Sequence, residues 1–159
     1  MKKEVSGCIE AIERIQKSMW AEGDLEFLDR LDDNEIPVWW AMSPSSPPPP
    51  YWLNQIVLDD IKRELSVTNM IWGVRMAFCP FVVHNYDNDA IMRAAVTAEN
   101  IAKEFDRNVF LDGAAHWTEL SAASPLISVD QRKELSQYIV RLHFNLRFGI
   151  QLQRPIPYC

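Results

Sequence analysis

The residues best placed to do chemistry are His84-Asn85-Tyr86-Asp87-Asn88-Asp89, where an imidazole and two carboxylates lie within six positions. Imidazole nitrogens and carboxylate oxygens are common ligands of divalent cations. The same Asp and Asn residues are also typical of turns, and Asn88 or Asp89 can cap the helix predicted after them. Turn chemistry explains the whole segment, so we predict a helix start here, with no metal and no cofactor. An enzyme that uses His84, Asp87 or Asp89 stays open as a third alternative.

The remaining candidate nucleophiles and bases do not form a known catalytic pattern. The sequence contains no G-x-S-x-G elbow of the kind that exposes a catalytic serine. Its cysteines, Cys8, Cys79 and Cys159, are too far apart for a C-x-x-C zinc or redox motif, so we expect reduced structural thiols. His116 could act as a general base, but the sequence specifies no partner for it. We therefore predict no catalytic residues and no enzyme.

The clearest pattern in the chain is the alternation over residues 138–152. Apolar residues point one way, whereas Arg141, His143 and Arg147 fall among the polar residues of the other face. An average strand has ~5–6 residues, so a strand of this length needs partners. A basic stripe that binds single-stranded nucleic acid needs aromatic residues on the same face, but here they fall on the apolar face. We therefore expect these three basic side chains to contact a neighbouring subunit.

Other segments show helical or strand periodicity. Residues 5–20 carry apolar side chains three and four positions apart, which predicts an amphipathic helix. Residues 70–83 alternate between bulky and small or polar side chains, which predicts a long strand that Pro80 ends or bulges. Residues 51–65 are ambiguous, because apolar residues four apart fit a helix whereas the run at 55–58 fits a strand, and we expect a helix or a twisted hairpin arm. We further expect a short helical turn over 24–31, a strand over 36–42, a helix over 90–106, and a short strand over 126–129 within a loop-rich segment, 114–133.

Aromatic side chains flank the one low-complexity stretch, the Pro-rich residues 43–50. We interpret this stretch as a rigid connector or exposed loop, although polyproline II ligands for aromatic-lined grooves have a similar composition. Interface cores are enriched in aromatic residues, and the subunit interface that we predict includes Trp39, Trp40, Tyr51 and Trp52. For Tyr51 and Trp52 a place in the hydrophobic core is an equal alternative, and one of Trp39 and Trp40 is expected in the core.

Length and charge narrow the class of protein. A chain of 159 residues fits a single domain, 1–159, that carries the Pro-rich loop and an extended tail at 153–159. A net charge of -6 argues against a protein whose main task is to hold phosphates. No apolar run approaches the ~20 residues of a membrane span, and no signal-peptide core follows the first residues. We expect a cytosolic product that does not associate with membranes.

The expected order of elements is helix, strand, mixed segment, long strand, helix and terminal strand pair. This order predicts an α+β fold, in which helices pack on one face of an antiparallel sheet with a long C-terminal strand. It resembles the order in the tail-terminator (tail-completion) proteins and related head–tail connector proteins of long-tailed bacteriophages. The resemblance covers most of the chain. It rests on the helix at 5–20, the strand Ile36-Pro37-Val38-Trp39-Trp40, the strand at 70–79 that leads through a polar turn into the helix at 90–106, and the strand at 138–152.

The resemblance implies a non-enzymatic virion subunit that forms a ring, typically a hexamer. Such a ring would cap the tail tube or bridge tail and neck proteins, and DNA would pass through its lumen without specific binding. The subunit would assemble in the host cytoplasm. The alternative is a small phage-encoded adaptor or inhibitor that binds a host protein through the same aromatic and acidic surfaces. Assembly state separates the two, because a ring needs head-to-tail contacts that close.

Overall fold

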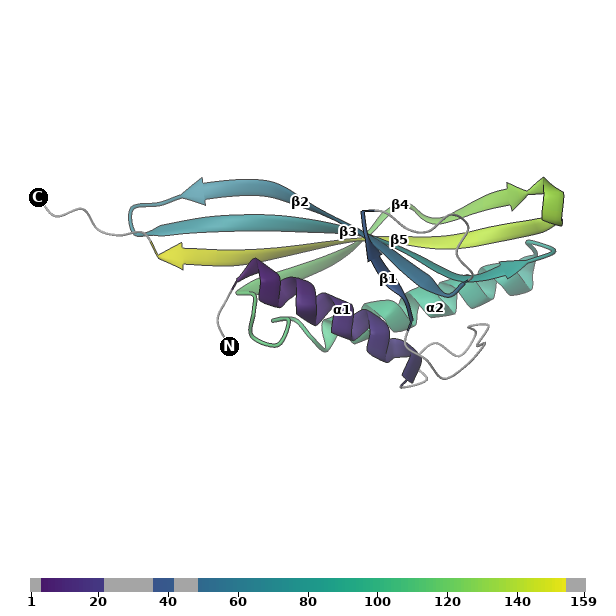
Figure 1. Ribbon diagram of the computed structural model, residues 1–159, viewed down its shortest axis with the longest axis horizontal. Coiled ribbons are helices and arrows are strands. Elements are labelled where there is room, and N and C mark those ends of the chain that lie inside the picture. The colour runs from purple at the N-terminus through teal and green to yellow at the C-terminus, as the bar shows by residue number, and fades with distance from the viewer. Residues whose placement is uncertain (1–3, 22–35, 42–48, 154–159) are drawn as a thin grey trace, which may run out of the picture.

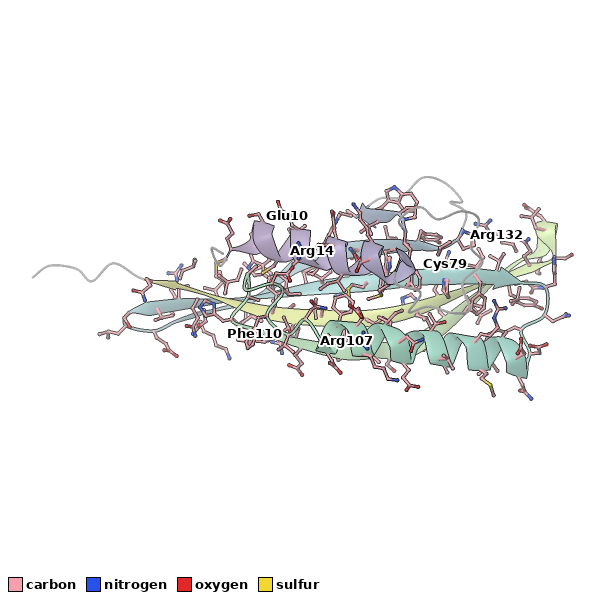
Figure 2. The ribbon with its side chains drawn as sticks, turned by 90° about the horizontal axis from the view of Figure 1, so that it is seen from below. Glu10, Arg14, Cys79, Arg107, Phe110 and Arg132 are labelled. Atoms are coloured by element: carbon pink, nitrogen blue, oxygen red, sulfur yellow. The ribbon has the colours of Figure 1, made fainter. Side chains whose placement is uncertain are left out.

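The computed structural model describes residues 4–21, 36–41 and 49–153 of the chain. Both helices lie on the same face of one twisted sheet (Figure 1), and they are seen together in front of it in Figure 2. This arrangement confirms the predicted α+β fold with helices on one face. The elements are, in chain order, α1 (Val5–Ala21), β1 (Val38–Trp40), β2 (Tyr51–Arg63), β3 (Val67–Val83), α2 (Asn88–Asp106), β4 (Trp117–Arg132), a single 3-10 turn (Lys133–Leu135) and β5 (Gln137–Gln153).

The described strands form one sheet in the order β1-β2-β3-β5-β4. β1 runs parallel to β2, and every other neighbouring pair is antiparallel. The two central strands, β3 and β5, each have 17 residues and pair with each other along most of their length. This pairing supplies the partners that the long C-terminal strand needs, and it confirms that strand.

The alternation in β5 places its apolar side chains against the helices. Leu142, Phe144, Leu146 and Phe148 are all buried in the main core. Since successive side chains of a strand point to opposite faces, the polar residues between them lie on the other side of the sheet. β3 follows the same rule, with Val74, Met76 and Phe78 in the same core.

The two helices cover this apolar face with side chains at helical spacing. α1 buries Cys8, Ile12, Ile15 and Met19, as the three- and four-residue periodicity predicts. α2 buries mainly small residues, among them Ala90, Ala94 and Ala98, followed by Ile101 and Phe105. Small side chains allow the helix to lie close to its neighbours. Arg14 of α1 (Figure 2) also forms an ion pair with Asp112 in the segment that follows α2.

The cap of α2 differs from the expected one. The N-cap is Asp87, whose Oδ1 accepts a hydrogen bond from the backbone N–H of Ala90 at 3.0 Å. The prediction of Asn88 or Asp89 as the cap was therefore wrong, because the helix starts with Asn88. Asp89 instead lies in the first turn, where its negative charge favours the positive end of the helix dipole.

Of the helix and the twisted hairpin arm expected over 51–65, the helix is wrong and the hairpin arm is confirmed, because Tyr51–Arg63 form strand β2, which pairs antiparallel with β3. Leu53 and Val57 are four apart, and a spacing of four also keeps side chains on one face of a strand, whereas the register shift between Leu58 and Asp60 turns Ile61 to the other face. The pairing of β2 with β3 decides the structure, from Tyr51 opposite Cys79 to Arg63 opposite Thr68.

The loop-rich character predicted for 114–133 is wrong, since most of this segment is the 16-residue strand β4, but the short strand predicted over 126–129 is present as part of β4. β4 is the outermost strand of the sheet and is at most half-buried along its length, so its sequence lacks a strong apolar alternation. The strand register breaks between Ala122 and Ile127, around Pro125. A second break lies between Phe78 and Phe81, where Pro80 bulges β3 without ending it, as one of the two expected outcomes allows.

Several predictions fall on residues outside the described ranges. They concern the helical turn over 24–31, most of the Pro-rich loop 43–50 and nearly all of the tail 153–159. The strand predicted over 36–42 is present, but it is limited to Val38–Trp40.

Candidate functional site

The sheet face opposite to α1 and α2, called here the outer face, carries most of the polar side chains of the central strands. Strand register arranges them in rows across the sheet. One row holds Gln55 of β2, Arg75 of β3, Asn145 of β5 and Ser121 of β4. The neighbouring rows hold Leu53, Ala77 and His143 on one side, and Val57, Gly73, Arg147 and Glu119 on the other.

A small apolar cluster forms one end of the outer face. Tyr51, Cys79 and Ile139 are buried there, and Trp39 of β1 packs against them. The rings of Trp39 and Tyr51 lie 5.7 Å apart between centroids in a tilted geometry. Burial raises the pKa of Tyr51 and, to about 11, the pKa of Cys79, while the guanidinium of Arg141 opposes both shifts. The Cys79 thiol is therefore a packed, protonated side chain.

The middle of the outer face contains a hollow with a volume of about 430 Å³. His143 and Ser128 stand in its wall, with 2.7 Å between Nε2 and Oγ. Burial, and then the nearby positive charge of Arg141, lower the pKa of His143. The imidazole is therefore neutral at neutral pH, and Arg75 is the cation of this hollow. The hollow is lined from β2, β3, β4 and β5, with apolar side chains that include Leu53, Ala77, Ala123 and Pro125.

A row of charges, called here the charge row, crosses the sheet beside the hollow. The Arg147 guanidinium lies 3.3 Å from Asp59 on one side and 3.8 Å from Glu119 on the other. Asp59 belongs to β2 and reaches Arg147 over Gly73 of β3, where a Cβ atom would stand 2.8 Å from its carboxylate. The Arg–carboxylate contact across an intervening strand thus depends on a residue without a side chain. Arg141 has a similar partner in Asp130 of β4.

The structure brings together five of the seven residues predicted for a subunit interface. Trp39, Tyr51, Arg141, His143 and Arg147 all lie on the outer face, as the register of their strands requires.

Trp40 and Trp52 lie on the opposite side. Trp52 is fully buried and stacks on Phe78 with 4.4 Å between ring centroids. Trp40 is half-buried, and its indole N–H donates to Glu13 of α1. Alternation within the strands explains both positions, because each tryptophan follows a residue of the outer face. Trp52 is therefore a core residue, the second of the two alternatives, and its inclusion in an exposed interface is corrected.

Sequence reasoning missed other members of the outer face. Arg75, Ser128 and Asn145 line the hollow, and Asp59 and Glu119 complete the charge row. Arg75 and Asn145 occupy the polar phase of two alternating strands, which was a usable signal. Asp59 and Glu119 gave none, because no strand was specifically predicted over them, and the short strand predicted over 126–129 did not single out Ser128.

The segment from His84 to Asp89 is used for structure. Asp87 caps α2, and His84 Nδ1 lies 3.1 Å from the carbonyl oxygen of Ser136. Within residues 4–21, 36–41 and 49–153, no group of three His, Cys, Asp or Glu side chains is arranged to hold a metal ion.

The contact between Ser128 and His143 is the nearest approach to a nucleophile and its base. A catalytic base of this kind is normally oriented by a third group that bonds to its other ring nitrogen. Among the described residues, none forms such a bond with Nδ1 of His143. The arrangement matches a polar cross-strand contact on a sheet face.

Comparisons with models of known protein families and with curated proteins found no match. In the described part of the chain, neither α1 nor α2 combines the length with the apolar character that crossing a membrane requires.

Proposed function

We propose that this chain is a virion structural subunit of a long-tailed phage. It assembles head to tail into a ring, a hexamer in the favoured form, as a tail terminator or neck connector. The proposal is supported by the order of elements that resembles those proteins. The subunit acts through contacts with copies of itself and with tail tube or neck proteins, and it carries no catalytic centre. It is made in the host cytoplasm and incorporated into the virion.

The observation that carries the proposal is the chemistry of the outer face. One face of the sheet is closed by helices, whereas the other presents a small apolar cluster with the half-buried Trp39 packed against it, a hollow and a charge row. Apolar patches bordered by paired charges are typical of protein contact surfaces. The two faces of this subunit differ, so a contact that joins one face to the other is heterologous, and such contacts generate rings when the rotation closes.

The charge distribution is compatible with DNA that passes through a lumen without binding tightly. Tight binding to a phosphate backbone needs Lys and Arg side chains that are available to replace counterions. Here Arg141 and Arg147 are engaged by carboxylates of neighbouring strands. The whole chain also carries a net charge of -6. Repulsion between such a subunit and DNA favours sliding over capture.

Solution mass tests this proposal. Light scattering of the full chain, over a wide range of protein concentration and salt, should show a species of about six subunits that grows at the expense of the monomer. Arg147→Glu, which places like charges beside Asp59 and Glu119, should shift assembly to higher concentration. Lys103→Glu on the exposed side of α2 is the matched control and should leave assembly unchanged. A monomer or dimer at every concentration, together with capture of a host protein, would favour the adaptor alternative.

A further inference from the structure

Parts of β2, β3 and β5 extend beyond the N-terminal end of α1 and form an arm (Figure 1). The arm comprises residues 58–72 of the β2–β3 hairpin and residues 149–153 of β5. In Figure 1 it projects on the left, away from the start of α2, which lies at the opposite end of the sheet. The central strands thus continue past the part of the core that α1 covers.

The side of the arm that continues the core face is apolar and partly exposed. Leu58 lies opposite Trp72, Ile61 opposite Met70, and Leu152 opposite Thr68. Trp72 and Met70 are in phase with Val74 and Met76 of the core, so Leu58, Ile61 and Leu152 share that face. They are 43%, 42% and 44% exposed, and we call them the arm patch. Apolar side chains gathered at one site, rather than scattered singly, indicate a contact surface.

The first turns of α2 present the complementary surface. Met92 is 66% exposed and Ile91 43% exposed, on the side of the helix that faces away from the sheet. Asp89 lies one turn before Met92 and forms no ion pair with any residue of the described ranges. We call these three residues the α2 patch.

The two patches match in charge as well as in polarity. Arg63 lies opposite Thr68, in the same row as Leu152, and is the charged residue on the core side of the arm. Like Asp89, it has no ion-pair partner within residues 4–21, 36–41 and 49–153. The patches stand at opposite ends of one molecule, so they meet only between molecules.

We propose that the arm patch of one copy docks on the α2 patch of a second copy, with Arg63 facing Asp89. This inference rests on the proposed function, because it names one contact of the head-to-tail assembly, separate from the outer face. Every copy carries both the arm patch and the α2 patch. Since the two patches match in charge and in apolar character, the partner that they fit is a second copy of the chain. The contact is heterologous and therefore propagates from copy to copy.

A charge swap tests the contact. Arg63→Glu places a carboxylate against Asp89, so it should raise the protein concentration needed for half-assembly by about tenfold or more. Asp89→Arg alone should weaken assembly in the same way, and the double variant should restore it. The matched control is Lys62→Glu, because Lys62 lies opposite Asn69 on the other side of the arm and outside both the hollow and the charge row, so it should have little effect. Circular dichroism of each variant checks that the monomer is folded.

A cross-link reports the contact independently of ring closure. Ile61→Cys and Met92→Cys are combined with Cys159→Ser, and the protein is treated with a mild oxidant. We expect a ladder of covalent oligomers, because each copy carries both partners of the disulfide. Ile61→Cys alone and the pair Lys62→Cys with Met92→Cys should not form the ladder.

The outcomes separate this inference from the proposed function. A ladder that ends in a closed ring, with rescue by the charge swap, supports both. A ladder of open oligomers supports the arm contact and removes the ring. Rings that form normally in Arg63→Glu, without a cross-link between positions 61 and 92, overturn the arm contact and leave the ring in place. A wild-type chain that stays monomeric and gives no ladder overturns both.

Discussion

Two buried amides tie α1 to the sheet. Gln16 and Asn54 are fully buried and exchange two hydrogen bonds, with Nε2 of Gln16 donating at 2.9 Å and Nδ2 of Asn54 donating at 2.8 Å. A buried amide costs free energy unless its hydrogen-bonding groups find partners. The pair therefore fixes which residue of α1 faces β2, rather than adding much net stability.

Removal of one amide should cost more than removal of both. Gln16→Leu leaves Asn54 buried without its partner, and we expect the free energy of unfolding to fall by ~1–3 kcal/mol. Gln16→Leu combined with Asn54→Leu removes both unsatisfied groups, so much of that loss should return. Urea unfolding of the wild type, of Gln16→Leu, of Asn54→Leu and of the double variant, at a concentration where the chain is monomeric, measures the coupling. Equal, additive losses would show that the two side chains act independently.

The buried thiols of Cys8 and Cys79 should be unreactive in the folded chain. Both are buried, and burial raises the pKa of Cys8 to about 12 and that of Cys79 to about 11. The thiolate is the reactive form, so at pH ~8 neither should react with an aromatic disulfide reagent. In a Cys159→Ser background we expect no labelling of the native protein and labelling of both thiols after unfolding. Rapid labelling of native Cys79 would show that the apolar cluster of the outer face opens readily.

The same thiols should make the fold weaker at high pH. The unfolded chain gives up each thiol proton near pH 9, whereas the folded chain holds it until about pH 11 or 12. Between these values the folded state binds more protons than the unfolded state, so the free energy of unfolding falls as pH rises. We expect a loss of about 1 kcal/mol per pH unit for each thiol in this window. Urea unfolding at several pH values should give a shallower decline for Cys79→Ala than for the wild type.

At the scale of the element, two glycines allow side chains to lie flat across the outer face. Gly73 of β3 leaves room for the Asp59 carboxylate, and Gly149 of β5 leaves room for the indole of Trp117. In both places a side chain of an outer strand occupies the space above a central strand. The sheet thereby gains a contact between non-neighbouring strands, from Asp59 of β2 to Arg147 of β5. It also gains a contact between the edge strand β4 and β5, where Trp117 covers Gly149.

Alanine at the two positions should have different effects. At Gly149 a Cβ atom would overlap the rigid Trp117 ring, and we expect a loss of ~1–3 kcal/mol in the free energy of unfolding. At Gly73 it would meet the end of the flexible Asp59 side chain, which can swing away at the cost of an exposed ion pair of ~0.2–1 kcal/mol. Urea unfolding of Gly73→Ala and Gly149→Ala compares them directly. A larger loss for Gly73→Ala would show that Asp59 is held more firmly than its exposure suggests.

The elements with a strong period were predictable from sequence, and the others were not. α1, α2, β3 and β5 each bury one continuous side, so their apolar residues recur with the period of the structure. The sequence of β2 left a helix and a hairpin arm open, because a four-residue spacing of apolar residues suits a strand as well as a helix. β4 was missed because an outer strand with both faces partly exposed has little apolar pattern to read.

The outer face was predictable only in part. The polar phase of β5 pointed to Arg141, His143 and Arg147 before their surroundings were known. Their partners come from β2, β3 and β4, and which residue stands opposite which depends on strand register. Register is set by the bulges at Pro80 and near Pro125 as well as by turns. Local sequence does not encode such pairing, so the charge row became visible only in the folded chain.

At the scale of the whole molecule, the protein is an elongated sheet with unlike surfaces at its two ends and on its two faces (Figure 1). The outer face, the arm patch and the α2 patch are distinct surfaces, so a contact that joins one of them to another is heterologous. Head-to-tail growth of this kind either closes or continues without limit. The proposed ring therefore requires a fixed angle between successive copies. Long paired strands that are cross-linked by ion pairs form a rigid subunit, and a rigid subunit helps to keep that angle constant.

Acidification should dismantle such a ring through His143. Burial and then the charge of Arg141 lower the pKa of this imidazole, with Asp130 opposing them. In the unfolded chain the pKa of His143 has its ordinary value of 6.5. As pH falls below this value, the unfolded chain takes up the proton more readily than the folded chain. The free energy of unfolding that His143 contributes above this pH is therefore lost. If the outer face is buried between copies, the free monomer likewise protonates before the ring does.

We expect the assembled mass to fall as pH is lowered from about 7.5 to about 5.5, where carboxylates remain largely ionised. His143→Gln should keep the ring at the lower pH, because it cannot gain a charge beside Arg141. A ring of His143→Gln that dissociates over the same range as the wild type would place the acid-sensitive contact elsewhere than the outer face.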